Sequence, residues 1–303
     1  MAEITRENLL KLDRGIQKLF EQAMKERGAN ELYKLVATTI KSNNPTNSYT
    51  WLGDFPTMKE WVDERQLAEL QAHAYEISKK DWETSFSVSR DDITFNALGS
   101  VKIKVDALAE AVIDHYNALV VKLITTNGKC YDGKNFFGDH TKGSDKKTYS
   151  NKSELALTKD NVFKVIADMQ LIMREDGETS FGVKPNVLIY SPDLHQQALK
   201  ITKGIVSDGS TNEAKDILTP ISVSGMAAGT WAVLDCTRSL KPFIIQITKE
   251  ATSPERNDGD LFKQKKVHYG IDTMDNAGYG LWEFAHFCSG SSTPNDAESD
   301  GEE

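Results

Sequence analysis

A loop in the middle of the chain comes close to a known phosphate-binding motif. Its residues, Gly128-Lys129-Cys130-Tyr131-Asp132-Gly133-Lys134-Asn135, fit the pattern G-x-x-x-x-G-K-[ST] at every position except the last. Asn135 cannot replace the hydroxyl that binds magnesium in that motif. The motif also needs a helix directly after it, but residues 136–139 do not begin one. We therefore interpret the segment as a lysine-rich surface loop and keep a nucleotide-binding enzyme only as an alternative.

Three other groups of residues could supply nucleophiles, acids or metal ligands. Cys130, Asp139 and His140 are close in sequence, but no Cys-x-x-Cys pair or second histidine completes a zinc site. The stretch Ser222-Val223-Ser224-Gly225 lacks the first glycine of the serine-hydrolase elbow. The pair Asp91-Asp92 separates a predicted strand from a predicted helix, where carboxylates cap the helix. These patterns predict no catalytic residue, no metal ion and no cofactor.

Three of the five tryptophans fall within one otherwise polar block, residues 49–92. Any one of them could pack in a core, and stacking on single-stranded nucleic acid would need a basic groove, against which the neighbouring acids argue. As a set, aromatic side chains among charged ones are typical of protein interfaces. The predicted interface residues are Trp51, Trp61, Arg65, Tyr75, Lys80, Trp82 and Arg90.

The composition is that of a soluble globular protein. The chain has 303 residues, 39% of them hydrophobic, which is near the length at which one core splits into two, so we expect two lobes. The charged N-terminus does not resemble a secretion signal. The longest apolar run, residues 118–124, contains Lys122 and is far shorter than the roughly 20 residues that cross a bilayer. Three widely spaced cysteines, Cys130, Cys236 and Cys288, favour free thiols in a reducing cytoplasm.

The net charge of −9 is unevenly distributed along the chain. Residues 289–303 hold five acids and no base, so that −9 minus −5 leaves −4 for the rest. Tight binding of nucleic acid through its phosphates needs clustered Lys and Arg, and this balance argues against it. Because residues 289–303 are otherwise mostly Ser, Gly and other small residues, we predict a disordered acidic tail.

Apolar residues at helical spacing predict three helices. The first covers residues 5–28 and begins at the cap Thr5. Its apolar stripe must be covered either by the same fold or by an adjacent subunit. Steps of three and four over residues 105–123 predict the longest helix, and residues 160–174 follow a cap at Thr158.

Alternation of apolar and polar residues predicts strands. Trp82, Thr84, Phe86 and Val88 alternate with polar residues, as in a half-buried strand. The same alternation begins before residues 78–81, which predicts a hairpin through that polar loop. Residues 58–74 are rich in helix formers without a continuous stripe, and their structure stays open.

The second half of the chain has the pattern of an α+β lobe. A helix is expected to start at Ser191-Pro192 and to end at Gly204. The strands expected around it and after it cover residues 187–190, 231–234, 243–248, 266–273 and 279–287.

Several different short motifs follow one another over nearly the whole chain. They are Tyr49-Thr50-Trp51-Leu52-Gly53-Asp54-Phe55-Pro56, Glu60-Trp61, Trp82-Glu83, Val88-Ser89-Arg90-Asp91-Asp92-Ile93, Cys130-Tyr131-Asp132-Gly133, Phe136-Phe137, Asp139-His140, residues 235–242, Tyr269-Gly270 and Gly278-Tyr279-Gly280. Together they resemble the Mu-like prophage major head subunit family. Residues 141–159 and the acidic tail diverge.

The resemblance implies an α+β fold, the tailed-phage major capsid fold of the Hong Kong 97 type. Such a fold has an N-terminal arm, an extended loop, a peripheral domain with a long spine helix, and an axial domain. The segments that would correspond are 1–48 for the N-terminal arm, 49–92 for the extended-loop hairpin, 93–127 for the spine helix, 128–262 for the axial domain, 263–288 for the return strands of the peripheral domain and 289–303 for the tail.

The resemblance also implies a function. The protein would be a major capsid protein, not an enzyme, that self-assembles into pentamers and hexamers of an icosahedral head in the host bacterial cytoplasm. Its partners would be itself, a separate scaffolding protein, a portal, decoration proteins in some heads, and packaged double-stranded DNA enclosed without sequence-specific binding. A nanocompartment shell of the same fold is the other alternative. No residue pattern supports a Lys–Asn cross-link through Lys79 or Lys80 at the expected loop tip.

Overall fold

The chain divides into two compact units in the computed structural model. Unit 1 comprises Met1–Phe136 and Cys236–Trp282, and unit 2 comprises Phe137–Asp235 and Glu283–Glu303. The residues that the structure describes are 6–27, 31–53, 75–89, 91–92, 98–143, 145–204, 206–207, 210–257, 259 and 265–290. The open segment 58–74 and, beyond Gly290, the predicted acidic tail lie outside the described residues.

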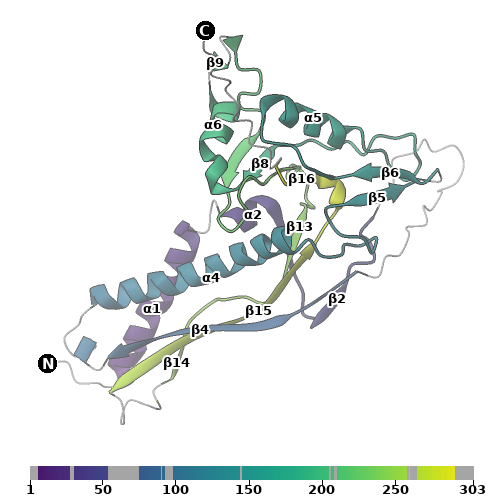
Figure 1. Ribbon diagram of the computed structural model, residues 1–303. Coiled ribbons are helices and arrows are strands. Elements are labelled where there is room, and N and C mark those ends of the chain that lie inside the picture. Colours follow the sequence, from purple (N-terminus) through teal and green to yellow (C-terminus); the bar gives the residue numbers. More distant parts are fainter. Residues whose placement is uncertain are drawn as a thin grey trace, which may run out of the picture. The chain divides into compact units, whose positions relative to one another are not determined.

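Unit 1 contains the two long helices that the apolar spacing predicts, and both are confirmed (Figure 1). Helix α1 spans Arg6–Arg27, the short α2 spans Leu32–Val36, and α4 spans Leu98–Thr126. Helix α1 packs against α4, and its apolar stripe is buried there without help from a neighbouring subunit. No helix in the described ranges is long and apolar enough to cross a membrane.

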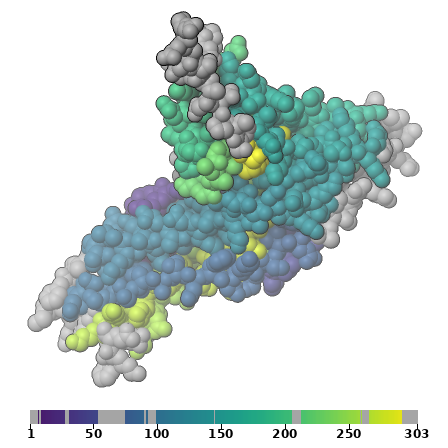
Figure 2. Space-filling view, viewed as in Figure 1, coloured from purple at the N-terminus to yellow at the C-terminus, as the bar shows by residue number. Residues whose placement is uncertain are grey.

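A five-stranded sheet lies beside these helices in unit 1. Strands β1 (Ala37–Lys41), β13 (Phe243–Lys249), β15 (Lys266–Tyr279) and β14 (Glu255–Asn257) follow in that order, and β4 (Lys80–Ser89) pairs with β15. Helix α4 contacts β4, β13 and β15. The surfaces of α4 and β4 can be followed next to one another in Figure 2. A long helix and the full length of β15 therefore form the framework of unit 1.

The predicted strand at residues 82–89 is confirmed, but the predicted hairpin is wrong. Trp82 pairs with Thr273 and Phe86 with Tyr269, so the alternating residues of β4 match the buried face of β15. Strand β3 (Glu76–Ser78) pairs instead with β2 (Thr46–Ser48). Only Lys79 separates β3 from β4, which is too short for a hairpin turn, and β15 supplies β4 with ten partners. Lys80 is therefore a strand residue and not part of a loop tip.

The strand predicted at residues 266–273 is confirmed but ends later than expected, at Tyr279, and the strand predicted at residues 279–287 begins only at Ala285, as β16. Strand β15 runs without a break over 14 residues, because β4 and β14 pair with its first part and β13 with its last. The polar run Met274-Asp275-Asn276 looks like a turn in sequence but remains extended, since all three residues pair with β13 and the first two also pair with β4.

Unit 2 is built on a second sheet, and the strands predicted at residues 187–190 and 231–234 are confirmed. The strand order is β11 (Thr219–Ser222), β8 (Val187–Tyr190), β12 (Trp231–Leu234), β16 (Ala285–Cys288) and β7 (Lys152–Ser153). Two further strand pairs are β5 (Asp139–Lys142) with β6 (Lys147–Ser150), and β9 (Val206–Ser207) with β10 (Ser210–Thr211).

The helices of unit 2 follow the sequence signals closely. Helix α5 (Lys159–Gln170) is capped by Thr158, whose side chain accepts from the Asn161 amide at 3.2 Å. The helix expected at Ser191-Pro192 begins as a 3-10 turn, η2 (Pro192–Leu194), and continues as α6 (His195–Lys203) up to Gly204. A second 3-10 turn, η3 (Trp282–Phe284), lies where the chain passes into unit 2. Cys130, Cys236 and Cys288 are free thiols, as expected.

A buried acid on β15 fixes helix α4 in unit 1. The side chain of Asp275 is fully buried, and its Oδ1 lies 2.8 Å from Nε2 of His115 on α4. Its other oxygen has no hydrogen-bond partner in the described part of the chain. Since an unsatisfied buried carboxylate is costly, the bond to His115 holds one position of α4 against one position of β15.

We expect His115→Ala to lower the free energy of unfolding by about 1.5–3 kcal/mol, the range for a hydrogen bond to a charged group. The substitution leaves Asp275 buried without its donor. Replacing Asp275 by Asn in the same chain should recover part of the loss, because a neutral amide is less costly to bury. Urea unfolding followed by circular dichroism measures both effects.

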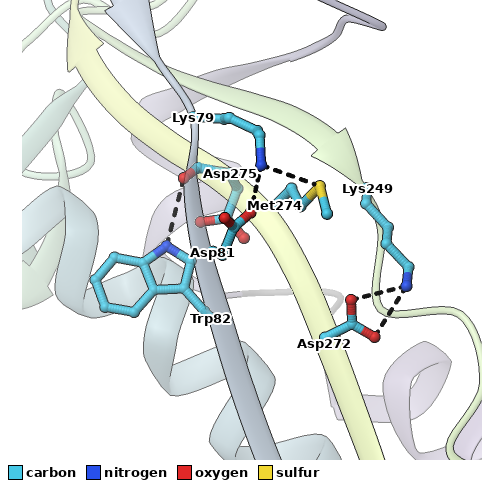
Figure 3. A network of polar contacts seen from close by, with 7 residues as sticks. All are labelled: Lys79, Asp81, Trp82, Lys249, Asp272, Met274 and Asp275. Atoms are coloured by element: carbon cyan, nitrogen blue, oxygen red, sulfur yellow. Dashed lines mark hydrogen bonds and ion pairs between the residues drawn. The ribbon is translucent and has the colours of Figure 1, made fainter. Parts of the chain in front are cut away.

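The matched control for this pair is Asp272→Asn on the same strand. Asp272 pairs with Lys249 at 2.8 Å, but both side chains are largely exposed to solvent (Figure 3). Its loss should therefore change the unfolding free energy much less. Equal losses for His115→Ala and Asp272→Asn would contradict the role given to Asp275.

Candidate functional site

The described parts of the chain on either side of residues 54–74 meet at one place in unit 1, which we call the arm root, residues 46–53 and 75–78. Here β2 and β3 pair antiparallel. The Tyr49 amide donates to the Tyr75 carbonyl, and the Lys79 amide donates to the Pro45 carbonyl, each at 2.7 Å. Residues 54–74, between the two sides of the root, lie outside the described residues. The described residues on either side of that segment are thus hydrogen-bonded to one another.

Two tyrosines attach the arm root to the sheet of unit 1. The Tyr49 hydroxyl donates to Oε1 of Gln246 on β13 at 2.9 Å. The backbone amide of Tyr279 on β15 donates to the Tyr75 hydroxyl at 2.7 Å. The arm root is therefore anchored to two different strands of the sheet, and it cannot rotate about either strand without breaking a hydrogen bond.

Gly278 allows the arm root to lie close to β15. A Cβ atom at this position would lie 2.5 Å from Cδ1 of Ile77 and 2.7 Å from the Tyr75 hydroxyl. Ile77 is only 3% exposed, so its side chain has little room to move away. The side-chain amide of Asn276, two residues earlier, donates to the Ser78 carbonyl at 2.7 Å. Glycine at 278 is therefore required by close packing.

The phenols at the root stay protonated at neutral pH. Burial raises the pKa of Tyr75 to about 12, and burial also raises the pKa values of Tyr49 and Tyr279. The Tyr279 hydroxyl donates to the Leu123 carbonyl at 2.8 Å and accepts from the Gly128 amide at 2.6 Å. Neutral phenols can thus tie the root, β15 and the C-terminal end of α4 together over the whole physiological pH range.

Trp82 lies at the start of β4, next to the buried acid (Figure 3). Its indole nitrogen donates to the Asp275 carbonyl at 3.4 Å, and its ring centroid lies 4.6 Å from that of His115. Lys79, just before the strand, contacts Asp81 and the sulfur of Met274. Trp82 nevertheless remains 37% exposed, which leaves part of an aromatic surface open to solvent.

The structure places four of the predicted interface residues near this root. Tyr75 belongs to it and is half-buried, Trp51 belongs to it and is 38% exposed, and Lys80 and Trp82 begin the adjoining strand β4. Trp61, Arg65 and Arg90 lie outside the described residues.

Sequence reasoning did not predict the contacts by which three residues position the site: His115, Asp275 and Gly278. Each acts through a partner far away in the chain, so that no local spacing signals it. His115 and Asp275, for example, are 160 residues apart.

The loop that resembles a phosphate-binding motif uses its own amides internally. It follows helix α4 and not a strand. The Cys130 amide donates to the Lys134 carbonyl at 2.8 Å, and the Lys134 amide donates to Oδ1 of Asp132 at 2.9 Å. A phosphate would need such amides free and pointing toward it. The loop geometry therefore argues against phosphate binding, but Cys130 and Tyr131 are buried, so the predicted surface loop is wrong at these two residues.

The predicted capping role of the acid pair is supported at Asp92. Its backbone amide donates to the Ser89 hydroxyl at 3.0 Å, and the Ser89 amide donates to its Oδ2 at 3.3 Å, as in a capping box. The hydrogen bond from Ser89 lowers the pKa of Asp92, which also lies 3.4 Å from the Lys104 amine. The acid is accounted for by local structure.

Comparison with known proteins gives the same family along nearly the whole chain. The family model described as "Mu-like prophage major head subunit gpT" matches residues 9–154, 148–226 and 219–298. The Mu-like prophage FluMu major head subunit of Haemophilus influenzae is 28% identical over 298 residues, covering 97% of this chain and 77% of the relative. The major capsid protein of Escherichia phage Mu is 27% identical over 266 residues, covering 86% and 67%.

A solved capsid structure agrees with these relatives in fold. A chain of the procapsid of bacteriophage JBD30 matches with a TM-score of 0.58 and 26% identity, over 97% of this chain and 78% of the other. The expected fold and the expected role as a phage capsid protein are thereby confirmed. The chain has the α+β, Hong Kong 97-type fold of tailed-phage capsid proteins, and it belongs to the family of Mu-like prophage major head subunits.

Proposed function

We propose that this chain forms the pentamers and hexamers of an icosahedral phage head, with residues 54–74 gripping a neighbouring subunit. The observation that carries the gripping role is the arm root. Both ends of residues 54–74 are joined there, and the root is hydrogen-bonded to β13 and β15. A force applied to that segment by a neighbour would therefore pass directly into the framework of unit 1.

The parts of a capsid subunit can be assigned to the two units. Residues 1–48 serve as the N-terminal arm, residues 49–92 as the extended loop, and α4 as the spine helix. Of the segment 128–262, Phe137–Asp235 belongs to unit 2, whereas residues 236–262 belong to unit 1. We therefore assign Phe137–Asp235 to the axial domain, and β13 and β14 to the peripheral domain together with β15.

The proposed partners follow from the same role. Copies of this chain assemble in the host bacterial cytoplasm with a separate scaffolding protein and a portal, and some heads add decoration proteins. The head encloses double-stranded DNA without sequence-specific binding, which suits a chain with a net charge of −9. The role is structural and requires no catalysis.

We expect the purified chain, coexpressed with the scaffolding protein, to form closed particles in negative-stain electron microscopy as concentration increases. Persistent monodisperse monomers in the presence of scaffold would contradict the proposal. The contents of particles produced during phage growth distinguish a DNA-containing head from a nanocompartment, which would contain enzymes.

Replacing residues 54–74 by a short Gly-Ser linker tests the gripping role. The arm root lies outside the replaced segment, so we expect the circular dichroism spectrum and the unfolding midpoint to change little. Particle formation, measured by sedimentation, should be lost because the neighbour is no longer held. A linker variant that still forms shells would refute this role.

Gly278→Ala should loosen the arm root without touching residues 54–74. We expect a loss of about 1–3 kcal/mol in unfolding free energy, as for other overpacked sites, together with a lower particle yield. Gly270→Ala on the same strand is the control, since the nearest atom to its Cβ would be an ordinary 3.7 Å away. Similar effects of the two substitutions would show that close packing at Gly278 is not what holds the root.

A further inference from the structure

A hollow on the surface of unit 1 lies between α4, β4 and β15. It has a cavity volume of about 100 Å³ and is lined by Trp82, Glu83, Val112, His115, Ile271 and Thr273, among others. Val112 and Ile271 are buried and form an apolar floor, while the exposed part of Trp82 forms a wall. Figure 2 shows the face on which β4 and α4 meet. The hollow thus offers an aromatic and aliphatic surface to a side chain of moderate size.

The rim of the hollow is acidic. Glu83 on β4 lines the hollow, is exposed, and forms no ion pair within the described part of the chain. The nearby Asp81 differs, since Lys79 already neutralises it. On the wall, the Thr273 hydroxyl is buried and has no hydrogen-bond partner among the described residues. Such a rim favours an apolar side chain that has a positive charge next to it.

The same chain presents a side chain of that kind on α4. Ile103 is 71% exposed, more than any other large hydrophobic residue in the described ranges. Its neighbour Lys102 is exposed and makes no ion pair among the described residues. An exposed isoleucine of this sort is stabilised when a partner covers it.

Ile103 cannot fill the hollow of its own subunit. It lies on the same helix as His115, twelve residues away, which is about 18 Å along a helix with a rise of 1.5 Å per residue. The two positions are also rotated by roughly 120° about the helix axis. A contact between them must therefore join two copies, and a contact between unlike surfaces of identical chains repeats around a ring or shell.

We propose that Ile103 of one copy inserts into the hollow between Trp82 and Val112 of a second copy, with Lys102 pairing with Glu83 at the rim. The inference rests on the proposed function and names a contact that residues 54–74 do not make. It predicts that Lys102 of one copy pairs with Glu83 of the next across the interface, in addition to the contact made by residues 54–74.

Reversing the charges of these two exposed residues tests whether they pair. Glu83→Lys and Lys102→Glu should each lower the particle yield about ten-fold or more, because like charges would face one another across the contact. The double variant should restore the yield to near that of the unsubstituted chain. The readout is sedimentation of particles formed with scaffolding protein, with circular dichroism to confirm that each variant is folded.

Lys122→Glu is the matched control, because it makes the same charge change at another exposed site on α4. Combined with Glu83→Lys it should restore nothing. The proposed contact is overturned if either single reversal assembles normally, if the double reversal remains defective, or if Lys122→Glu rescues equally well. If the unsubstituted chain forms no particles under these conditions, the proposed function itself fails, and the contact with it.

Discussion

The fold of unit 1 depends on the hydrogen bond made by one buried carboxylate, that of Asp275. Asp275 lies in the interior of the sheet, between Lys80 of β4 and Ile247 of β13, with its side chain fully buried. His115 provides its hydrogen bond from α4. Since leaving a charged group buried and unpaired is costly, α4 can neither slide nor rotate on the sheet without a substantial penalty. The surroundings are correspondingly apolar: burial, with a further contribution from Asp275, raises the pKa of Tyr116 beyond the ordinary phenol range.

Successive residues of β15 connect the Asp275–His115 hydrogen bond to the arm root. Asp275 holds α4, Asn276 binds the carbonyl of Ser78, and Gly278 leaves room for Ile77. Tyr279 then binds Tyr75 through its amide and the end of α4 through its hydroxyl. One extended strand therefore couples the helix to residues 75–78 of the arm root, while the other side of the root binds β13 through Tyr49 and Gln246. In a shell, a force on residues 54–74 would act on the whole subunit, because the arm root is hydrogen-bonded directly to β15.

Much of the fold could be predicted from local sequence patterns, and the failures share one cause. The spacing of apolar residues located α1, α4 and α5, and the alternation at Trp82 located β4, because each pattern reports which side of a single element is buried. The hairpin at residues 78–81 and the break within β15 were wrong, since strand pairing depends on partners distant in sequence. The sequence of Met274-Asp275-Asn276 suggests a turn, yet it remains extended because all three residues pair with β13 and the first two also pair with β4. The resemblance to a capsid family supplied what periodicity could not, namely the fold class and the role as a phage capsid protein.

The most direct measurement is a cryo-electron microscopy map of the assembled particle at a resolution that traces the chain. The account predicts that β4 remains paired with β15 of its own subunit, with Trp82 opposite Thr273, while residues 54–74 lie on a neighbouring subunit. A map in which residues 54–74 contact only their own subunit, or in which β4 leaves β15 to pair elsewhere, would contradict it.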